Sequence, residues 1–240
     1  MNQQTIDLGA LADRPLEQAG ALSLAPADRF EFACAGCGDC CRSREDIVLS
    51  GYDLWRIAAR LQLPAAVVLH GYCSWHTGAE SGLPVVRLRP LPGSKNCPFL
   101  HQSRCSIHEA APLVCALYPL AQQIDTETGQ VSYALQLTDC GGPAVRAVCA
   151  DYLNLYGVGH RQPIDVEWAV ECTRLSARVR ALLPQLHPAQ QKMLSRKVWE
   201  YLYRDLDWQQ PYPPQQLQGF AAVHAYLDKV HKRITDRKTI

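Results

Sequence analysis

The chain has 240 residues, of which 48% are hydrophobic and 20% are charged, a balance that is typical of globular domains and excludes wholesale disorder. Its 24 Lys and Arg residues against 23 Asp and Glu residues give a formal charge of +1, which excludes a global basic field that would drive binding to nucleic acid. No stretch approaches the about 18 apolar residues of a membrane span, so we expect neither nucleic acid nor a membrane as a partner.

Cysteine is over-represented, with 11 residues in the chain. The N-terminal segment carries Asp7, Asp13 and Glu17, and it lacks the positive start and long apolar run of a secretory signal. We therefore expect a cytoplasmic protein, in which clustered thiols serve as metal ligands or redox groups more often than as structural disulfides. The odd number of cysteines also argues against a complete disulfide framework.

The first elements are short. Residues 1–27 are expected to form an arm, and residues 30–42 to form a ligand loop, because Cys and Gly are too dense there for regular structure. Ser50, with Asp53 three residues later, predicts the capped start of a helix. A second short helix is expected over residues 64–70.

Two strands and a second ligand-bearing segment follow. Residues 84–89 and residues 131–137 show the alternation of strands. We expect these two strands to pair with each other in antiparallel orientation, because parallel strands need a long crossover. Between them, residues 97–119 carry three cysteines, and Pro112 suits the first turn of a short helix that would present Cys115.

The chain from Pro143 onward shows apolar residues at helical spacing, which is typical of amphipathic helices that pack on a core. Four helices are expected, with apolar stripes over residues 145–156, 168–182, 188–208 and, after Pro214, 220–234.

The expected fold is α+β and predominantly α, with an irregular metal-ligated part, a small antiparallel sheet and a helical part. We divide the chain into an N-terminal arm (1–27), a cysteine-cluster metal-binding domain (28–158) and a helical C-terminal region packed on it (159–240).

The densest motif is a run of four cysteines within eight residues, Cys34, Cys37, Cys40 and Cys41. A Cys-x-x-Cys turn brings two sulfurs toward one centre, and this spacing recurs in zinc and iron–sulfur sites. Neighbouring side chains tend to point apart, so we do not expect Cys40 and Cys41 to bind one small ion together. Further cysteines in loop or turn contexts complete a set of eight metal ligands, enough for one or two sites: Cys97, Cys105, Cys115 and Cys140.

The remaining cysteines and the nearby histidines are interpreted differently. Cys149 and Cys172 lie on apolar helical stripes, which favours core packing. Cys73 is expected in a loop, and its role stays open. His101 and His108 lie inside the second cysteine cluster and could coordinate a metal, but they are not at ligand spacing, so we favour their interpretation as polar neighbours.

These blocks closely resemble the YkgJ-type cysteine-cluster family, a zinc- or iron-chelating domain known by its CxxCxxCC pattern. The resemblance covers about residues 30–142, and the order of its blocks makes it specific. It implies metal or iron–sulfur binding without choosing between them. The matching residues are Phe32, Cys34, Cys37, Gly38, Cys40, Cys41, Arg42, Cys97, Phe99, Leu100, Cys105, Ile107, Glu109, Pro112, Cys115, Tyr118, Pro119 and Cys140.

The chain departs from the family where two arginines and a tyrosine are usual, at Ala111, Ala116 and His108. Flagellin lysine N-methylases are similar in this cysteine block, but the chain has no GxGxxG loop after a strand. The CxxxCxxC arrangement of radical enzymes is also absent, because position 44 is arginine.

Three functions stay open at this point. The first is a metal-binding protein that holds one or two iron–sulfur clusters, with the [4Fe–4S] type favoured, in a redox or cluster-dependent role. We favour it because thiolates are many and no histidine has ligand spacing. The second is a structural zinc-binding interaction module. The third is a cluster-dependent enzyme similar to a protein lysine N-methylase, for which the sequence offers no nucleophile or acid–base pair.

A protein partner or a redox partner is expected for the first two functions. Glu109 and Arg42 are expected close to the metal ligands, because ligands are usually oriented by neighbouring groups.

Overall fold

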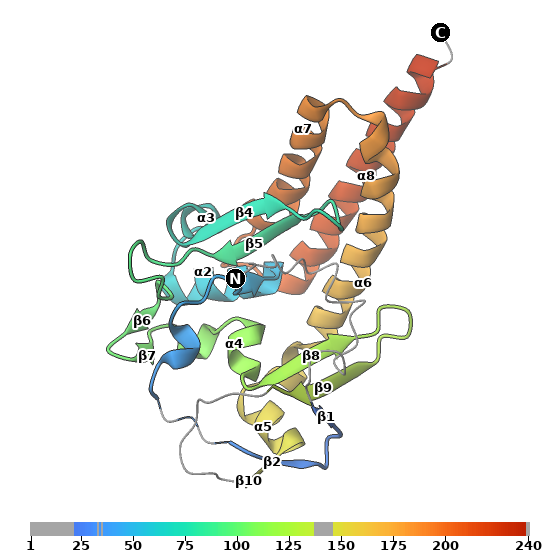
Figure 1. Ribbon diagram of the computed structural model, residues 1–240. Coiled ribbons are helices and arrows are strands. Elements are labelled where there is room, and N and C mark those ends of the chain that lie inside the picture. Colours follow the sequence, from blue (N-terminus) through green and yellow to red (C-terminus); the bar gives the residue numbers. More distant parts are fainter. Residues whose placement is uncertain (1–21, 33, 35, 137–145, 239–240) are drawn as a thin grey trace.

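The structure is a computed structural model that describes residues 22–32, 34, 36–136 and 146–238. Its helices account for much of this part of the chain, and α6 and α8 pack lengthwise against each other (Figure 1). Helices therefore dominate the fold, as the sequence predicts. The α-helices of the described residues are α2 (Gly51–Leu61), α3 (Ala65–Tyr72), α4 (Leu113–Leu117), α5 (Cys149–Leu155), α6 (Val158–Leu182), α7 (Pro188–Trp199) and α8 (Tyr212–Lys238).

Short 3-10 and π segments join or extend these helices. The π segment continues α7 by one turn, so the helix expected over residues 188–208 ends with a change of helix type. The short segments are η2 (Asp39–Cys41), η3 (His108–Ala110), η4 (Leu183–Gln185) and the π segment η5 (Glu200–Arg204).

The strands of the described residues form small antiparallel sheets in the orders β1-β9-β8, β10-β2, β3-β5-β4 and β6-β7. The predicted class, α+β and predominantly α with a small antiparallel sheet, is confirmed. The strands are β1 (Leu22–Leu24), β2 (Arg29–Glu31), β3 (Val48–Leu49), β4 (Cys73–Thr77), β5 (Pro84–Leu88), β6 (Leu100–His101), β7 (Arg104–Cys105), β8 (Leu120–Ile124), β9 (Val131–Leu135) and β10 (Arg146–Val148).

The pairing predicted for the two strands is wrong. β5 pairs with β3 and β4, with Trp75 opposite Val86, whereas β9 pairs with β1 and β8, with Gln122 opposite Tyr133. Each predicted strand therefore pairs with one strand that is close to it in the chain, β4 or β8, and with one that is distant, β3 or β1. β8 carries Gln122 and Gln123 next to each other, so its sequence lacks a clear apolar alternation.

Two segments expected to be irregular contain regular structure. Leu22–Leu24, assigned to the arm, forms β1 on the free edge of β9. The expected loop over 30–42 contains the end of β2 and the η2 turn. The two strands pair with distant residues, β1 with β9 and β2 with β10, which local composition does not reveal.

The capped start of α2 is confirmed. The Ser50 Oγ accepts a hydrogen bond from the Asp53 amide at 3.1 Å, and the Ser50 amide donates to Asp53 Oδ2 at 3.0 Å. This reciprocal pair satisfies two amides that the first helical turn would otherwise leave free. The Asp53 carboxylate is also almost fully buried, at 3% exposure.

The main core consists of buried side chains from residues 47–107 and 168–227. Both the cysteine-rich part and the helical rear contribute to it, so the rear helices pack on the front part. The division into regions 1–27, 28–158 and 159–240 stays a prediction. A second core joins the β-strands near the N-terminus to α5 and contains Phe30, Phe32, Leu117, Leu120, Tyr133, Cys149, Tyr152, Leu153 and Val158.

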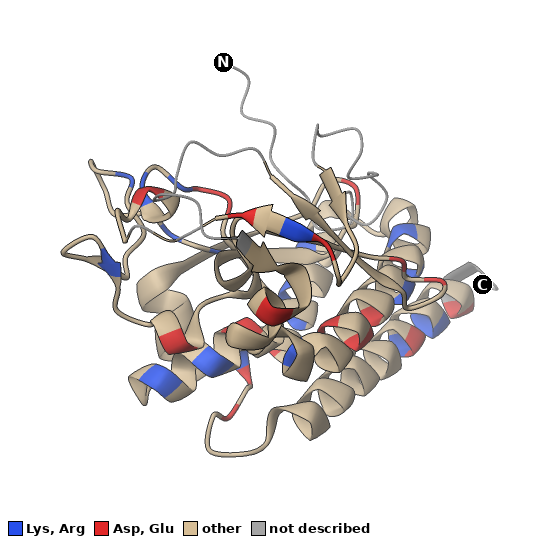
Figure 2. Cartoon of the chain, turned by 90° about the horizontal axis from the view of Figure 1, so that it is seen from below, with Lys and Arg blue, Asp and Glu red and all other residues tan. Residues whose placement is uncertain are grey.

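The charged side chains of both signs are interspersed along the rear helices (Figure 2). In the last turns of α8, Lys229, Lys232 and Arg233 are exposed, and Asp228 and Asp236 lie among them. None of the helices in the described residues combines the length and the apolar character needed to cross a bilayer.

Gly51 is where the start of α2 meets the rear helices. A β-carbon there would lie 2.5 Å from the Tyr212 hydroxyl and 2.8 Å from a ring carbon of Trp168. We expect Gly51→Ala to lower the free energy of unfolding by about 1–3 kcal/mol, because the packed rings must move. Gly71→Ala is the control, since nothing lies within 4 Å of its β-carbon. Urea unfolding that finds the two variants equally stable would contradict this contact.

Candidate metal centre

One cavity of about 480 Å³ gathers most of the predicted metal ligands. They come from the loop before η2, from η2 itself, from the segment before β6, from β7 and from α4. The structure thus brings together thiols from two distant parts of the chain. Cys140 lies outside the described residues. The seven cysteines that line the cavity are Cys34, Cys37, Cys40, Cys41, Cys97, Cys105 and Cys115.

The loop that carries Cys34 and Cys37 packs against the β6–β7 hairpin. Gly38 has a φ of +76°, and a β-carbon there would lie 3.0 Å from the Ser103 carbonyl oxygen. The Arg42 guanidinium donates to the Cys37 carbonyl oxygen at 3.2 Å and to the Ser103 hydroxyl at 3.0 Å. Only glycine tolerates both this backbone conformation and this close approach, so the position fits the tight ligand loop.

The second cysteine segment is joined to the first through the backbone. The Cys97 amide donates to the Cys41 carbonyl oxygen at 2.8 Å. This bond joins two predicted ligands that are separated in sequence by the whole α2–β5 region and that both line the cavity.

The neighbouring thiols of Cys40 and Cys41 lie together, which corrects the expectation that they point apart. Their sulfurs are 3.9 Å apart. Both residues belong to the η2 turn, where successive side chains are about 120° apart rather than on opposite faces as in a strand. The separation is close to the about 3.8 Å between two sulfurs of a tetrahedral zinc site with Zn–S bonds of about 2.3 Å.

The thiols at the centre of the cavity perturb one another. A hydrogen bond with Cys41, followed by burial, raises the pKa of Cys40 well above its ordinary value. The hydrogen bond with Cys40 lowers the pKa of Cys41, but a hydrogen bond with Cys97 and burial outweigh it and raise that pKa to about 11. The hydrogen bond from Cys41 in turn lowers the pKa of Cys97. These three thiols therefore form one coupled set.

Cys105 and Cys115 extend this set. Burial raises the pKa of both thiols, and the nearby Cys41 adds to the shift of Cys115. The Arg44 guanidinium opposes this shift at Cys115 and at Cys40. Arg44 is held in place by Asp46, which it contacts at 2.6 and 3.0 Å. Sequence analysis missed Arg44, although its position three residues after the four-cysteine run could have indicated it.

The donor chemistry fits a thiolate-bound metal. Burial and hydrogen bonds raise the pKa of most of these thiols, and a bound cation would replace their protons and stabilise the buried thiolates. In the part of the chain that the structure describes, no three Cys, His, Asp or Glu side chains enclose a single point at metal-binding distance. In this structure the cavity is therefore lined by many thiols that do not yet form a closed four-ligand site.

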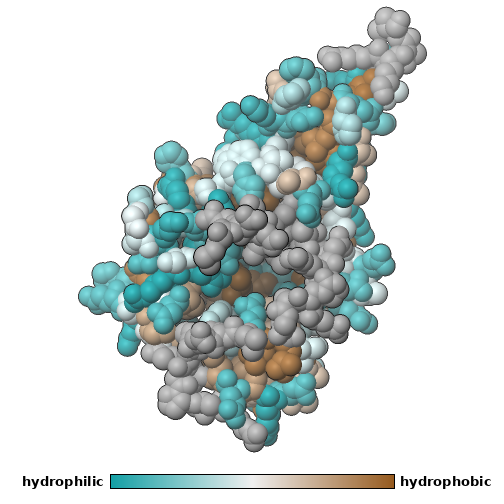
Figure 3. Space-filling model, in the orientation of Figure 1, coloured by the Kyte–Doolittle hydropathy of each residue, from teal (hydrophilic) through white to brown (hydrophobic). Residues whose placement is uncertain are grey.

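Apolar and aromatic side chains form much of the rest of the cavity wall, together with Ser103, Arg104 and His108. The Tyr152 hydroxyl donates to the Tyr118 carbonyl oxygen, and Phe32 packs edge-on against both rings. Figure 3 shows apolar residues near the centre of the face in view, close to where Figure 1 draws α4. Such a wall lowers the local dielectric constant and strengthens interactions between a metal and its thiolates.

The predicted neighbours of the ligands differ in their placement. Arg42 lies at the cavity loop, as expected. The Glu109 side chain is 88% exposed and lies 4.0 Å from Arg60, so it does not face the thiols. His108 lines the cavity beside Tyr156, whereas His101 is exposed outside its lining.

Of the cysteines that the structure describes, three lie outside the cavity lining. Cys149 is fully buried in the second core, and Cys172 packs against the main core, which confirms the core interpretation for both. Cys73 lies on β4 and not in a loop, and its side chain is buried in the main core. Burial raises the pKa of the Cys73 thiol to about 12.

Alkylation of the native, metal-free protein should separate these classes of thiol. We expect Cys34, which is exposed, to react rapidly with iodoacetamide, and Cys73 to stay unmodified because it is buried and protonated. Peptide mapping by mass spectrometry measures both rates, with the denatured protein as the reference. Equal rates in the native protein would contradict the placement of Cys73 in the core.

Comparison with known proteins supports a metal site. Residues 33–136 match the family model CxxCxxCC, described as "Putative zinc- or iron-chelating domain". This range includes all seven cysteines that line the cavity. No curated protein and no solved structure matches the chain.

Proposed function

Residues 33–136 match the family model of the CxxCxxCC zinc- or iron-chelating domain, and from this match we propose that the thiol-lined cavity binds an iron–sulfur cluster of the [4Fe–4S] type in a redox role. Metal binding itself follows from the family. The cluster and the redox role are the proposal, which includes a cytoplasmic location and a redox partner.

One observation carries this proposal: seven thiols line one cavity of about 480 Å³. A tetrahedral zinc ion needs four ligands, so the cavity offers more thiols than a single ion uses. Thiolate-rich ligation with few histidines suits iron–sulfur clusters. When bound, a cluster would supply one-electron transfer.

The chain's own residues have defined roles in this proposal. The coupled thiols of Cys41 and Cys97 would hold the inorganic centre. The aromatic wall around Tyr152 would exclude water from it, and the Arg44 guanidinium would offset the negative charge of the thiolates. Burial, hydrogen bonds and nearby charge are the means by which proteins set the potential of such centres.

A structural zinc site is the second candidate, and the 3.9 Å separation of the Cys40 and Cys41 sulfurs favours it. This distance equals about one edge of a zinc–thiolate tetrahedron. In that case the metal would stabilise the front part, and the helical rear would bind a protein partner.

Anaerobic purification followed by metal and acid-labile sulfide analysis distinguishes the two candidates. Brown protein with iron and sulfide in comparable amounts supports the cluster. Colourless protein with stoichiometric zinc and no sulfide rejects the cluster and supports the structural site.

A further inference from the structure

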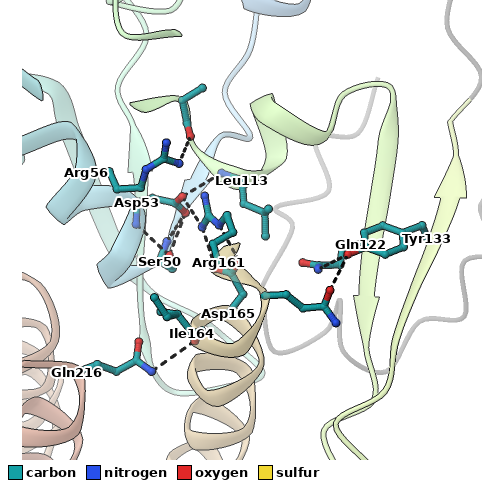
Figure 4. Close-up of polar contacts among 12 residues, drawn as sticks. Ser50, Asp53, Arg56, Leu113, Gln122, Tyr133, Arg161, Ile164, Asp165 and Gln216 are labelled. Carbon is teal, nitrogen blue, oxygen red and sulfur yellow. Dashed lines mark hydrogen bonds and ion pairs between the residues drawn. The ribbon is translucent and has the colours of Figure 1, made fainter. Parts of the chain in front are cut away.

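A buried carboxylate links the cysteine-bearing helix α4 to the rest of the fold (Figure 4). Asp53, on α2, accepts a hydrogen bond at Oδ1 from the Leu113 amide at 2.9 Å. The same oxygen accepts from the Arg161 guanidinium at 2.8 Å, while Oδ2 accepts from Ser50. One side chain thus contacts the starts of α2 and α4 and an arginine of α6.

α4 depends on this contact because it cannot cap itself. The helix spans only Leu113–Leu117, and its N-cap residue is Pro112, whose side chain accepts no hydrogen bond. A helix of this length is unstable on its own, and its first amides need partners from elsewhere. Asp53 provides an acceptor for the Leu113 amide, two residues before Cys115.

α2 also holds the backbone that leads into α4. The Arg56 guanidinium donates to the carbonyl oxygen of Ala111 at 3.3 Å and to that of Glu109. Figure 4 shows Arg56 and Asp53 projecting from the same helix toward this segment. α2 therefore fixes the chain on both sides of Pro112, with a donor before it and an acceptor after it.

Arg161 restrains the orientation of the Asp53 carboxylate. Its side chain is 3% exposed, and it donates from Nε and Nη2 to Asp165 at 2.6 and 2.8 Å. Its guanidinium also lies over the Tyr52 ring, 5.2 Å from the centroid. A buried ion pair of this kind allows little freedom of orientation, because any rotation leaves a buried charge unpaired. Arg161 lies outside the matched range 33–136, so a residue of the rear part supports the metal-binding part.

We propose that Asp53 is a positioning residue for the metal site, which holds α4 so that the Cys115 thiol faces the centre of the cavity. This inference rests on the proposed function, since it assumes that Cys115 binds the metal. Outer residues that orient ligands typically change metal affinity about 10–100-fold when they are replaced.

The first test compares Asp53→Asn with Asp165→Asn. Each variant removes one carboxylate charge beside Arg161, but only Asp53 contacts α4. The readouts are zinc affinity, from competition with a chromophoric chelator, and the sulfur-to-cobalt charge-transfer absorption of the Co(II)-loaded protein, which reports thiolate ligation. Thermal unfolding of the metal-free proteins measures the purely structural cost.

We expect Asp53→Asn to lower zinc affinity about 10–100-fold and to weaken the charge-transfer band, whereas Asp165→Asn leaves both unchanged. Equal losses of affinity in the two variants, or a wild-type affinity for Asp53→Asn, would overturn the proposal. If the wild-type chain binds neither zinc nor cobalt nor iron, the proposed function itself fails, and this result differs from a failure of positioning alone.

A second pair of variants tests the positioning role of Asp53 even if Asp53→Asn does not fold. Proline is tolerated at the first position of a helix and has no amide hydrogen, so Leu113→Pro deletes the hydrogen bond to Asp53 and keeps the buried ion pairs. Leu113→Ala is the matched control, because it loses the side chain and keeps the amide. We expect cobalt charge-transfer absorption to be weaker in Leu113→Pro than in Leu113→Ala, and equal spectra would overturn the proposal.

Discussion

Replacement of Cys41 by serine is expected to remove most of the metal from the protein. Cys41 occupies the middle of the coupled thiols, because its sulfur interacts with both Cys40 and Cys97 and its carbonyl oxygen accepts the Cys97 amide. A hydroxyl is a poor ligand for a metal that prefers soft thiolates. Metal affinity should therefore fall by more than the about 10–100-fold typical of a lost outer neighbour. Metal analysis after anaerobic purification measures this loss.

Cys172→Ala is the matched control for this variant. Cys172 lies on α6, outside the cavity lining, and burial raises the pKa of its thiol to about 12. We expect unchanged metal content and a packing cost of at most about 2 kcal/mol. Loss of metal in Cys172→Ala, or full metal content in Cys41→Ser, would refute the assignment of the cavity as the metal site.

The second large effect, on the free energy of unfolding, is expected for Arg161→Met. This change leaves two carboxylates, Asp53 and Asp165, buried without their cation. Removing one partner of a buried ion pair typically costs about 3–5 kcal/mol, because the remaining charge stays desolvated. We expect a loss of this size in the free energy of unfolding, measured by urea denaturation of the metal-free protein.

The pH dependence of this loss gives a further check. Burial raises the pKa of Asp165 above its ordinary value even with Arg161 present. Without the arginine, the folded protein binds protons more readily than the unfolded chain, so its stability falls as the pH rises and recovers as the pH falls. The difference between Arg161→Met and the wild type should therefore shrink toward acidic pH. A difference that grows on acidification would show that the buried carboxylates are not its cause.

Local patterns were sufficient where the interacting groups are close in sequence. The capped start of α2 needs only Ser50 and Asp53, and both strands at 84–89 and 131–137 were located within a residue or two of β5 and β9. The choice of partner strand was wrong, because β8 and β4 have mixed polar sequences and gain their stability from cross-strand pairs. Pairing is a property of the assembled sheet and not of one strand.

The cysteines show the same contrast between what local sequence reveals and what only the tertiary structure reveals. Their spacing and density indicate a metal site without any structure, and the sorting of Cys149 and Cys172 into the core follows from helical periodicity. Cys73 could not be placed in this way, because β4 is a strand that only its neighbour β5 makes recognisable. The contact between the Cys40 and Cys41 sulfurs likewise depends on the η2 turn, which forms where the loop meets the β6–β7 hairpin.

By itself, the sequence predicted a metal site built from cysteines, since ligand chemistry depends on residue type and short spacing, and the family match supports metal binding in general. It also determined a mostly helical fold, because amphipathic periodicity extends over many residues. Only the tertiary structure decided that Cys34 and Cys115 line one cavity and that a carboxylate of α2 and an arginine of α6 hold the helix that carries Cys115. Such contacts join residues far apart in the chain, and their stability comes from burial and ion pairing that exist only once the core has formed.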